Sequence, residues 1–231
     1  APQTERSKFK EVQKVYLENQ LLFLSMNDYQ AGNKTFGVGT AYDVVIVKNK
    51  KNDDSILCEV ENSSGEKCQI NLNTMEFIPE GSFDTFLDLL PKEGEEKIDL
   101  LYSRSAYGSD KNNMSHEKDK THIHPCVYTI GKSGEPRLMF SNTKNNGHFD
   151  IAKVIWSNGA ATVPIVDSTG EYGLTQFSYA IVDKKENLEN IKKALENKEF
   201  LKLMKKVSFS AHKYNFRVIS CFKKDWWKSF V

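Results

Sequence analysis

The chain has 231 residues, of which 39% are hydrophobic and 27% charged, and its formal net charge is +1. These values indicate a globular protein of one or two domains, and they argue against a disordered chain or a uniformly basic coat for nucleic acid. No apolar run approaches the roughly 20 residues of a membrane-spanning helix. No signal peptide opens the sequence, so we expect a cytoplasmic protein with no membrane partner.

The charges are distributed unevenly along the chain. Residues 53–96 hold twelve acids and two lysines, whereas residues 200–231 hold eight lysines and arginines and one acid, Asp225. This uneven distribution of charge favours contact between the basic C-terminal segment and phosphates, and it disfavours such contact for the acidic segment. The four cysteines show no CxxC spacing, so we expect buried free thiols, with neither a metal site nor a disulfide framework.

The first 50 residues predict a helix, two strands and an intervening turn. Apolar residues at helical spacing indicate a helix at residues 7–19. A short apolar run indicates a strand at 21–26, and a β-branched run indicates a second strand at 41–47, after a turn-rich stretch at 28–34. A helix followed by two strands is typical of the closing portion of an α/β sheet, and we assign residues 1–50 to such a portion.

Residues 51–97 predict a connecting segment. Strands at 56–61 and 67–72 flank the turn sequence Asn-Ser-Ser-Gly, which indicates a hairpin. A helix at 83–90 ends before Pro91. The charged stretch 92–97 then marks a domain boundary.

Residues 98–231 predict a mixed, mainly β domain with two C-terminal helices. The long polar stretch 107–124 lacks any pattern and is expected to be a loop. Strands are expected at 98–103, 127–130, 137–141, 153–156, 164–166, 178–182 and 216–222, and helices at 186–197 and 199–206. The whole chain therefore belongs to the α/β or α+β class.

Polar loops in this third segment carry side chains suited to reading DNA bases. Arginine, lysine, asparagine and histidine hydrogen-bond to base edges in the major groove. The candidates for base reading are Arg104, Asn142, Lys144, His148 and Lys153. For Arg104, a structural salt bridge to the acidic neighbourhood is an equal alternative.

A second group of residues is suited to phosphate contact. Hydroxyls beside Arg104 and the lysines of the basic, aromatic C-terminal segment would anchor a duplex without reading its sequence. These candidates are Ser103, Ser105, Lys111, Lys205, Lys206, Lys213, Lys223 and Lys224.

A metal-dependent nuclease is one alternative, because His122, His124 and His148 occur near Asn145 and Asn146. The helix that should carry the last metal ligand is missing, which makes exposed loop histidines the simpler interpretation. A second alternative is an interaction module that docks a partner subunit through the acidic segment 53–96. Phosphate-binding glycine loops and nucleophile-elbow motifs are absent, so no complete active site is visible.

Seven segments together resemble the C-terminal half of large adenine-specific DNA methyltransferases of restriction-modification systems, of the giant-virus and bacterial type II kind. They are KTFGVGTAYD (34–43), EFIP (76–79), YSRSAYG (102–108), NGHF (146–149), KVI (153–155), EYGLT (171–175) and FKKDWW (222–227).

The resemblance implies that the first segment supplies the last strands of the methyltransferase sheet. It implies that residues 98–231 form the target-recognition domain, which grips double-stranded DNA while an adenine is flipped out. The loops after Ser103, around residues 141–148 and around Lys153 would face the DNA.

The sequence departs from this family in one respect. The Asn-Pro-Pro-Tyr motif and the S-adenosylmethionine loop do not occur in it. We therefore expect no catalytic residue and no cofactor in this chain. S-adenosylmethionine would bind the N-terminal catalytic half, in the same chain or in a separate subunit.

Overall fold

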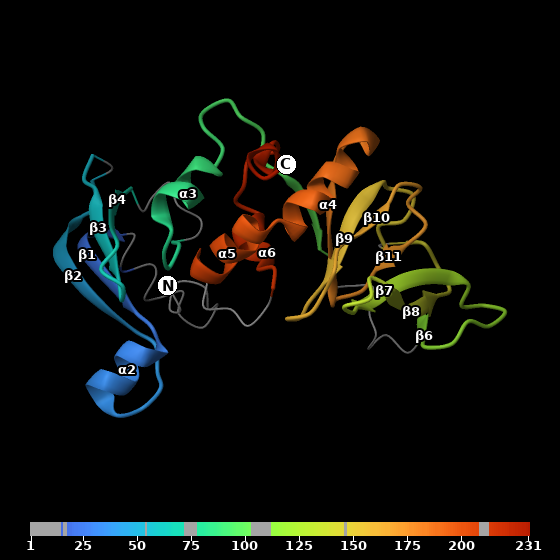
Figure 1. Cartoon of the computed structure of the whole chain (residues 1–231), viewed down its shortest axis with the longest axis horizontal. Coiled ribbons are helices and arrows are strands. Elements are labelled where there is room, and N and C mark those ends of the chain that lie inside the picture. Colours follow the sequence, from blue (N-terminus) through green and yellow to red (C-terminus); the bar gives the residue numbers. More distant parts are fainter. Residues whose placement is uncertain are drawn as a thin grey trace. The chain divides into compact units, whose positions relative to one another are not determined.

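The computed structural model describes residues 15, 18–53, 55–71, 78–102, 112–145, 147–207 and 213–231. The chain forms two compact units (Figure 1). Unit 1 comprises Ala1–Leu89 and Lys205–Phe209, and unit 2 comprises Leu90–Met204 and Ser210–Val231. The first crossing between the units, after Leu89, lies close to the boundary expected at residues 92–97. Most of the helix expected at residues 7–19 lies outside the described residues.

Unit 1 contains a four-stranded sheet in the order β2-β1-β3-β4. Strand β1 (Asn19–Asn27) pairs antiparallel with β2 (Tyr42–Lys51) and parallel with β3 (Cys58–Asn62), which forms a hairpin with β4 (Lys67–Ile70). The expected strands and hairpin are thus confirmed. Because one sheet contains all four strands, residues 1–50 and the hairpin that follows share one core, formed by Leu21, Leu24, Met26, Cys58, Val60, Ile70, Ile78 and Phe83.

The segment expected to be a turn at residues 28–34 is instead helix α2 (Tyr29–Phe36). One carboxylate oxygen of Asp28 accepts hydrogen bonds from the backbone N–H groups of Gln30 and Ala31, at 3.0 and 2.9 Å. This N-cap stabilises a short helix that has little apolar periodicity of its own, which is why its sequence resembles a turn.

The acidic hairpin of unit 1 uses a carboxylate to begin helix α3 (Phe83–Asp88). The two side-chain oxygens of Glu66 accept hydrogen bonds from the backbone N–H groups of Ser82 and Phe83, both at 3.0 Å. The side-chain amide of Asn62 donates to the same carboxylate at 3.2 Å. Some of the acidic charge in residues 53–96 is therefore satisfied within the unit.

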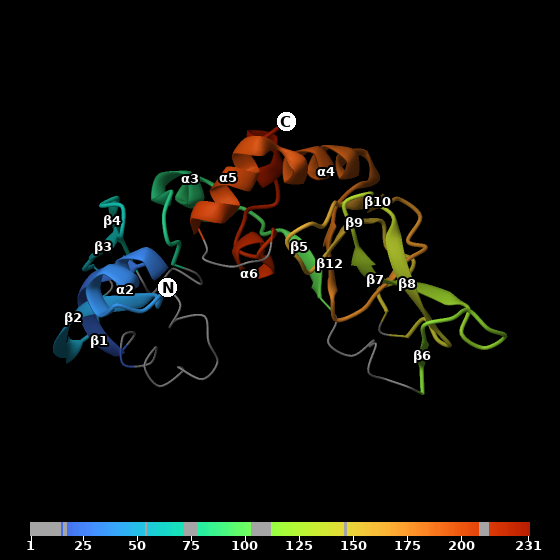
Figure 2. The same cartoon turned by 60° about the horizontal axis from the view of Figure 1, so that its bottom comes forward.

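Unit 2 is built on two four-stranded sheets (Figure 2). One has the order β10 (Ile165–Asp167), β9 (Lys153–Ser157), β12 (Ser178–Val182), β5 (Asp99–Tyr102). The other has the order β11 (Gly173–Leu174), β7 (His124–Ile130), β8 (Pro136–Ser141), β6 (Met114–Ser115). Apolar residues from both sheets form one core, which contains Val127, Ile130, Ile155, Leu174 and Ala180. The mixed α+β class and the six strands expected between residues 98 and 182 are confirmed, and β6 lies within the expected loop.

The C-terminal part of the chain is helical. A 3-10 turn, η3 (Lys185–Asn187), leads into α4 (Leu188–Glu196) and α5 (Lys198–Val207), which confirms the two expected helices. The strand expected at residues 216–222 is wrong, because α6 (Phe216–Ile219) occupies it, with the Asn215 side chain accepting a hydrogen bond from the Arg217 N–H at 3.0 Å. A last 3-10 turn, η4 (Trp226–Ser229), follows. None of the helices in the described residues has the length and apolar character needed to cross a membrane.

All four cysteines are free thiols, and three of the four are buried as expected. Cys58, Cys126 and Cys221 are buried, and Cys68 is half-buried. Burial raises the pKa of both Cys58 and Cys126 to about 12, so these two thiols stay protonated at neutral pH and act as apolar core residues.

Candidate nucleic-acid interface

Two polar loops of unit 2 lie against each other. The first, residues 142–145 and 147–152, follows β8, and the second, residues 168–172, follows β10. We call them the paired loops. The Asp150 N–H donates to the carbonyl of Gly170, and the Leu174 N–H donates to the carbonyl of Gly147, both at 2.8 Å. These backbone bonds join the first loop to the second and to the strand that follows it.

Small residues allow this close contact. Gly170 has a φ of +76°, and a Cβ atom at this position would lie 2.3 Å from the backbone nitrogen of Ile151. A Cβ on Gly173 would lie 2.4 Å from the ring of Phe149, a buried side chain of the first loop. Any other residue at position 170 would need both a strained backbone and a separation of the loops.

A buried ion pair lies at the base of both loops. The Lys153 ammonium donates to the Asp167 carboxylate at 2.9 Å and to the carbonyl of Ile151 at 3.0 Å. Asp167 also accepts hydrogen bonds from the backbone N–H groups of Gly170, Glu171 and Tyr172, at 2.9, 2.9 and 3.0 Å. The two side chains are 0% and 1% exposed. Burial lowers the pKa of Lys153, and the hydrogen bond and charge of Asp167 oppose that shift.

The first loop has a distinctive backbone. His148 and Asp150 have φ values of +58° and +60°, which are uncommon for residues with a side chain. Burial, and secondly the positive charge of Lys153, lower the pKa of His148 below its usual value. Its imidazole is therefore neutral at pH 7 and offers one hydrogen-bond donor and one acceptor.

The outer surface of the paired loops is polar. The Lys144 ammonium contacts the Asp150 carboxylate at 2.8 Å and lies 5.9 Å from the centre of the Phe149 ring. The side-chain amide of Asn142 donates to the carbonyl of Asn112 at 3.2 Å, and the residue is exposed. The exposed residues on this surface are Asn142, Lys144, Asn145, Asp150, Ser168, Thr169 and Glu171, with His148 half-buried among them. Amides, hydroxyls, an imidazole and an ammonium group are suited to hydrogen bonding with base edges.

The structure brings together three of the five side chains expected to read bases. Asn142, Lys144 and His148 belong to one loop, whereas Arg104 lies outside the described residues. The expectation for Lys153 requires correction. Its ammonium is fully buried and paired with Asp167, so it supports the loops from beneath and is not available to a base.

The residues expected to contact phosphate, where the structure describes them, have different environments. Ser103, Ser105 and Lys111 lie outside the described residues. Lys205 and Lys206 are exposed at the end of α5, in the part assigned to unit 1. The Lys213 ammonium donates to the carbonyl of Thr162 at 2.9 Å, and burial lowers its pKa, so its role is internal to unit 2.

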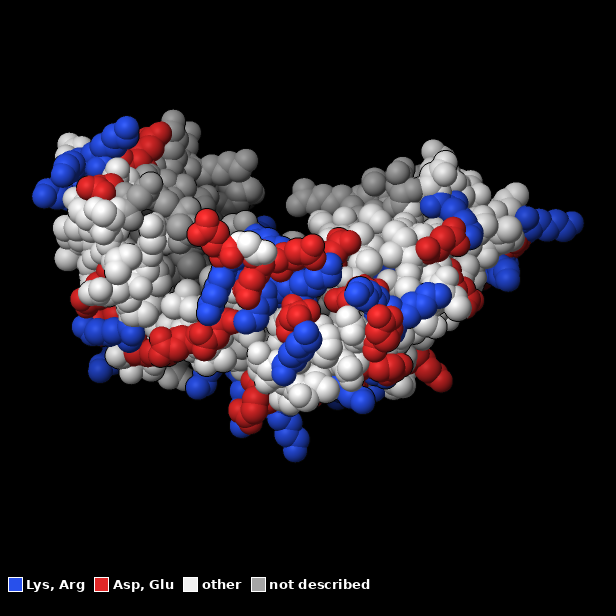
Figure 3. All heavy atoms as spheres, turned by 90° about the horizontal axis from the view of Figure 1, so that it is seen from above, with Lys and Arg blue, Asp and Glu red and all other residues white. Residues whose placement is uncertain are grey.

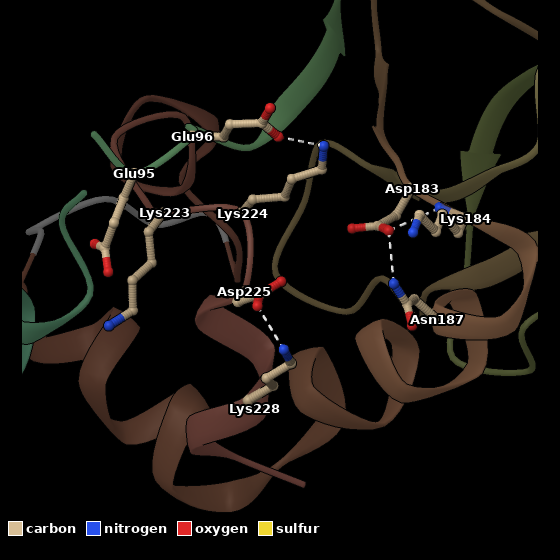
Figure 4. Close-up of a pocket in the computed structure, with 9 residues that line it drawn as sticks. All are labelled: Glu95, Glu96, Asp183, Lys184, Asn187, Lys223, Lys224, Asp225 and Lys228. Carbon is tan, nitrogen blue, oxygen red and sulfur yellow. Dashed lines mark hydrogen bonds and ion pairs between the residues drawn. The ribbon is translucent and has the colours of Figure 1, made fainter. Parts of the chain in front are cut away.

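Lys223 and Lys224 line a pocket of about 470 Å³ in which lysines and carboxylates are equal in number (Figure 4). The Lys224 ammonium contacts Glu96 at 2.6 Å, and Lys228 forms a second ion pair, with Asp225. Carboxylates therefore offset the positive charge of the lysines that line this pocket. Figure 3 shows blue and red side chains interspersed on the face it presents.

The histidines considered for a nuclease have separate environments. The Nδ1 atom of His122 contacts the carboxylate of Asp119 at 2.8 Å, while the His124 ring lies 5.9 Å from the ring of Phe149. Among the side chains that the structure describes, no three His, Cys, Asp or Glu residues are grouped so as to hold a metal ion.

Sequence reasoning missed Asp167 and Phe149, which organise the paired loops. The spacing Asp-Ser-Thr-Gly at residues 167–170 is a usable signal, because an Asp side chain often accepts hydrogen bonds from N–H groups a few residues later. No family model matches this sequence, and no curated protein is significantly similar to it.

Proposed function

We propose that this chain is a recognition module for double-stranded DNA, the specificity part of a methyltransferase that modifies the exocyclic amino group of adenine in a restriction-modification system. The observation that carries this proposal is the pair of polar loops, whose backbone is fixed by a fully buried ion pair. The paired loops are the element that reads base edges.

Recognition of a DNA base sequence requires hydrogen-bond donors and acceptors of the protein at fixed positions. Each well-placed contact to a base edge discriminates by roughly 1–3 kcal/mol. Asn142, Lys144 and His148 supply an amide, a cation and a neutral imidazole from one loop with a fixed backbone. The exposed Lys144–Asp150 pair costs little to open, so this ammonium can turn to a DNA acceptor.

Methyl transfer itself belongs to a partner in this proposal. The catalytic half would bind S-adenosylmethionine and the flipped adenine, because the sequence lacks the motifs for both. The outer edge of β2 supports such a partner. Within the described residues, no strand pairs with this edge, and the side chains of Val44 and Ile46, on one face of β2, are 48% and 55% exposed. An unpaired apolar edge is a surface for strand addition.

The DNA-reading proposal predicts that the chain selects a sequence from a library of randomised duplexes. Replacing Lys144 with methionine is then expected to weaken binding to the selected duplex by roughly 5- to 150-fold, the loss of one base contact. Lys132→Met is the matched control, because Lys132 is exposed in the turn at the opposite end of the β7–β8 hairpin. Gel-shift titrations at two salt concentrations measure both effects.

Failure to retain any duplex at low salt would contradict the DNA-reading proposal. Cleavage of plasmid with Mg²⁺ or Mn²⁺ that disappears in His148→Ala would instead support the nuclease. Binding to a protein partner with no affinity for DNA would support the interaction module.

The partner proposal predicts that the chain without its catalytic half self-associates through the β2 edge. Ile46→Lys is expected to keep it monomeric, because a lysine on the outward face opposes strand addition. Sedimentation velocity over a range of concentrations measures this, with Lys48→Ala as a control on the same strand. A wild-type chain that stays monomeric at every concentration contradicts self-association through the β2 edge.

A further inference from the structure

We propose that the buried Lys153–Asp167 pair is a positioning device that fixes the spacing of the paired loops and so determines which DNA sequences are discriminated. This inference rests on the proposed function. It assigns the two residues a role beneath the reading surface, with no direct contact to DNA.

The pair joins the two loops at a single point of the sheet. Lys153 begins β9, directly after the first loop, and Asp167 ends β10, directly before the second. The two residues are opposite each other in the antiparallel β9–β10 register. Their ion pair therefore fixes the positions at which both loops leave the sheet.

Each partner also holds the loop beside it. The Lys153 ammonium donates to the carbonyl of Ile151, at the end of the first loop. The Asp167 carboxylate accepts hydrogen bonds from three backbone N–H groups of the second loop. The two charged side chains are 0% and 1% exposed, and hydrogen bonds to buried charged groups are strong and directional.

Stability alone is a weak reason for such a pair. Taking two charges out of water carries a desolvation penalty that their attraction often only balances, and apolar residues of similar volume serve a core as well. The pair differs from an apolar contact in its geometry, since four hydrogen bonds to one carboxylate allow little displacement. Binding sites need their groups held within about 0.5 Å, which such a network provides.

The position of His148 illustrates the consequence. The bond from the Asp150 N–H to the Gly170 carbonyl keeps the first loop against the second. His148 lies between Gly147 and Asp150, on a backbone that few other arrangements allow. A second loop displaced from Asp167 would release this part of the first loop, and with it the backbone that carries His148.

The test is the selectivity ratio of Lys153→Met, defined as affinity for the selected duplex over affinity for a scrambled duplex. This variant removes the ammonium and keeps the length of the side chain, while three N–H groups still satisfy Asp167. We expect the ratio to fall by roughly tenfold or more, with affinity for the scrambled duplex nearly unchanged. Lys132→Met, with the same loss of charge, is expected to keep the wild-type ratio.

The ratio separates positioning from stability. A variant that only loses stability lowers the active fraction for both duplexes equally and leaves the ratio unchanged. A folded Lys153→Met protein with the wild-type ratio would overturn the inference and leave the proposed function intact. A wild-type chain that selects no sequence would refute the proposed function itself.

A measurement on the wild-type chain tests the same inference should Lys153→Met fail to fold. The amides of Gly170, Glu171 and Tyr172 are expected to resist hydrogen exchange in the free protein, because Asp167 already holds them. If these amides exchange freely and become protected only when the selected duplex is added, the ion pair does not fix the loop conformation before DNA binds. The inference then fails.

Discussion

Asp167→Ala is expected to lower the free energy of unfolding of unit 2 by about 3–5 kcal/mol, because it leaves a buried charge without its partner. The substitution removes the acceptor of four hydrogen bonds. It leaves the Lys153 ammonium inside the protein with only the carbonyl of Ile151, and it leaves three N–H groups of the second loop without their acceptor.

Hydrogen exchange of the slowest amides in β9 and β12 measures this loss for unit 2 alone, which matters because the two units need not unfold together. Asp150→Asn is the control. Its carboxylate is 71% exposed, its pair with Lys144 is a surface pair, and asparagine tolerates the φ of +60° at this position, so the change is expected to stay within about 0.5 kcal/mol. Equal effects of the two substitutions would show that the Lys153–Asp167 pair is not buried in solution.

Trp226→Ala is expected to destabilise unit 2 by about 3–5 kcal/mol, the cost of emptying a large buried site. The Trp226 ring is 0% exposed and lies 4.7 Å from the ring of Phe200 and 5.6 Å from that of Phe222, centre to centre. These contacts connect the C-terminal turn to the start of α5.

Thermal unfolding measures the effect, with Lys228→Ala as a neighbouring exposed control on the same turn. The alternative outcome is informative for function. If Trp226→Ala leaves stability unchanged but abolishes DNA binding, the tryptophan is on the surface, and the basic, aromatic C-terminal segment contacts DNA after all.

Local sequence pattern predicted most of the secondary structure. The apolar run of β1, the β-branched residues of β2, β9 and β12, and the turn between β3 and β4 all favour the conformation that the structure shows. The sequence pattern predicted the wrong element where a single capping side chain stabilises a short helix. Asp28 caps α2 and Asn215 caps α6, and in each case a short helix replaces the turn or strand that composition favours.

The candidate site was predicted in part. The amides, lysine and histidine of residues 142–148 were identified because polar side chains gathered between strands have few structural uses. Lys153 was included for its charge, but a sequence does not state which face of a strand a side chain occupies when all its neighbours are apolar. Asp167 was overlooked because the residues whose N–H groups it binds lie in a loop, with no periodic pattern.

The sequence by itself determined the mixed α+β class, most of the strands and helices, and the polar chemistry of the first loop, because these depend on residue type and short-range order. Only the tertiary structure decided that Lys153 is buried against Asp167, that Trp226 is a core residue and that Lys224 is neutralised by Glu96. Each of these outcomes joins residues distant along the chain. Burial and ion pairing depend on distances in space, and those distances are set only when the sheets and helices pack.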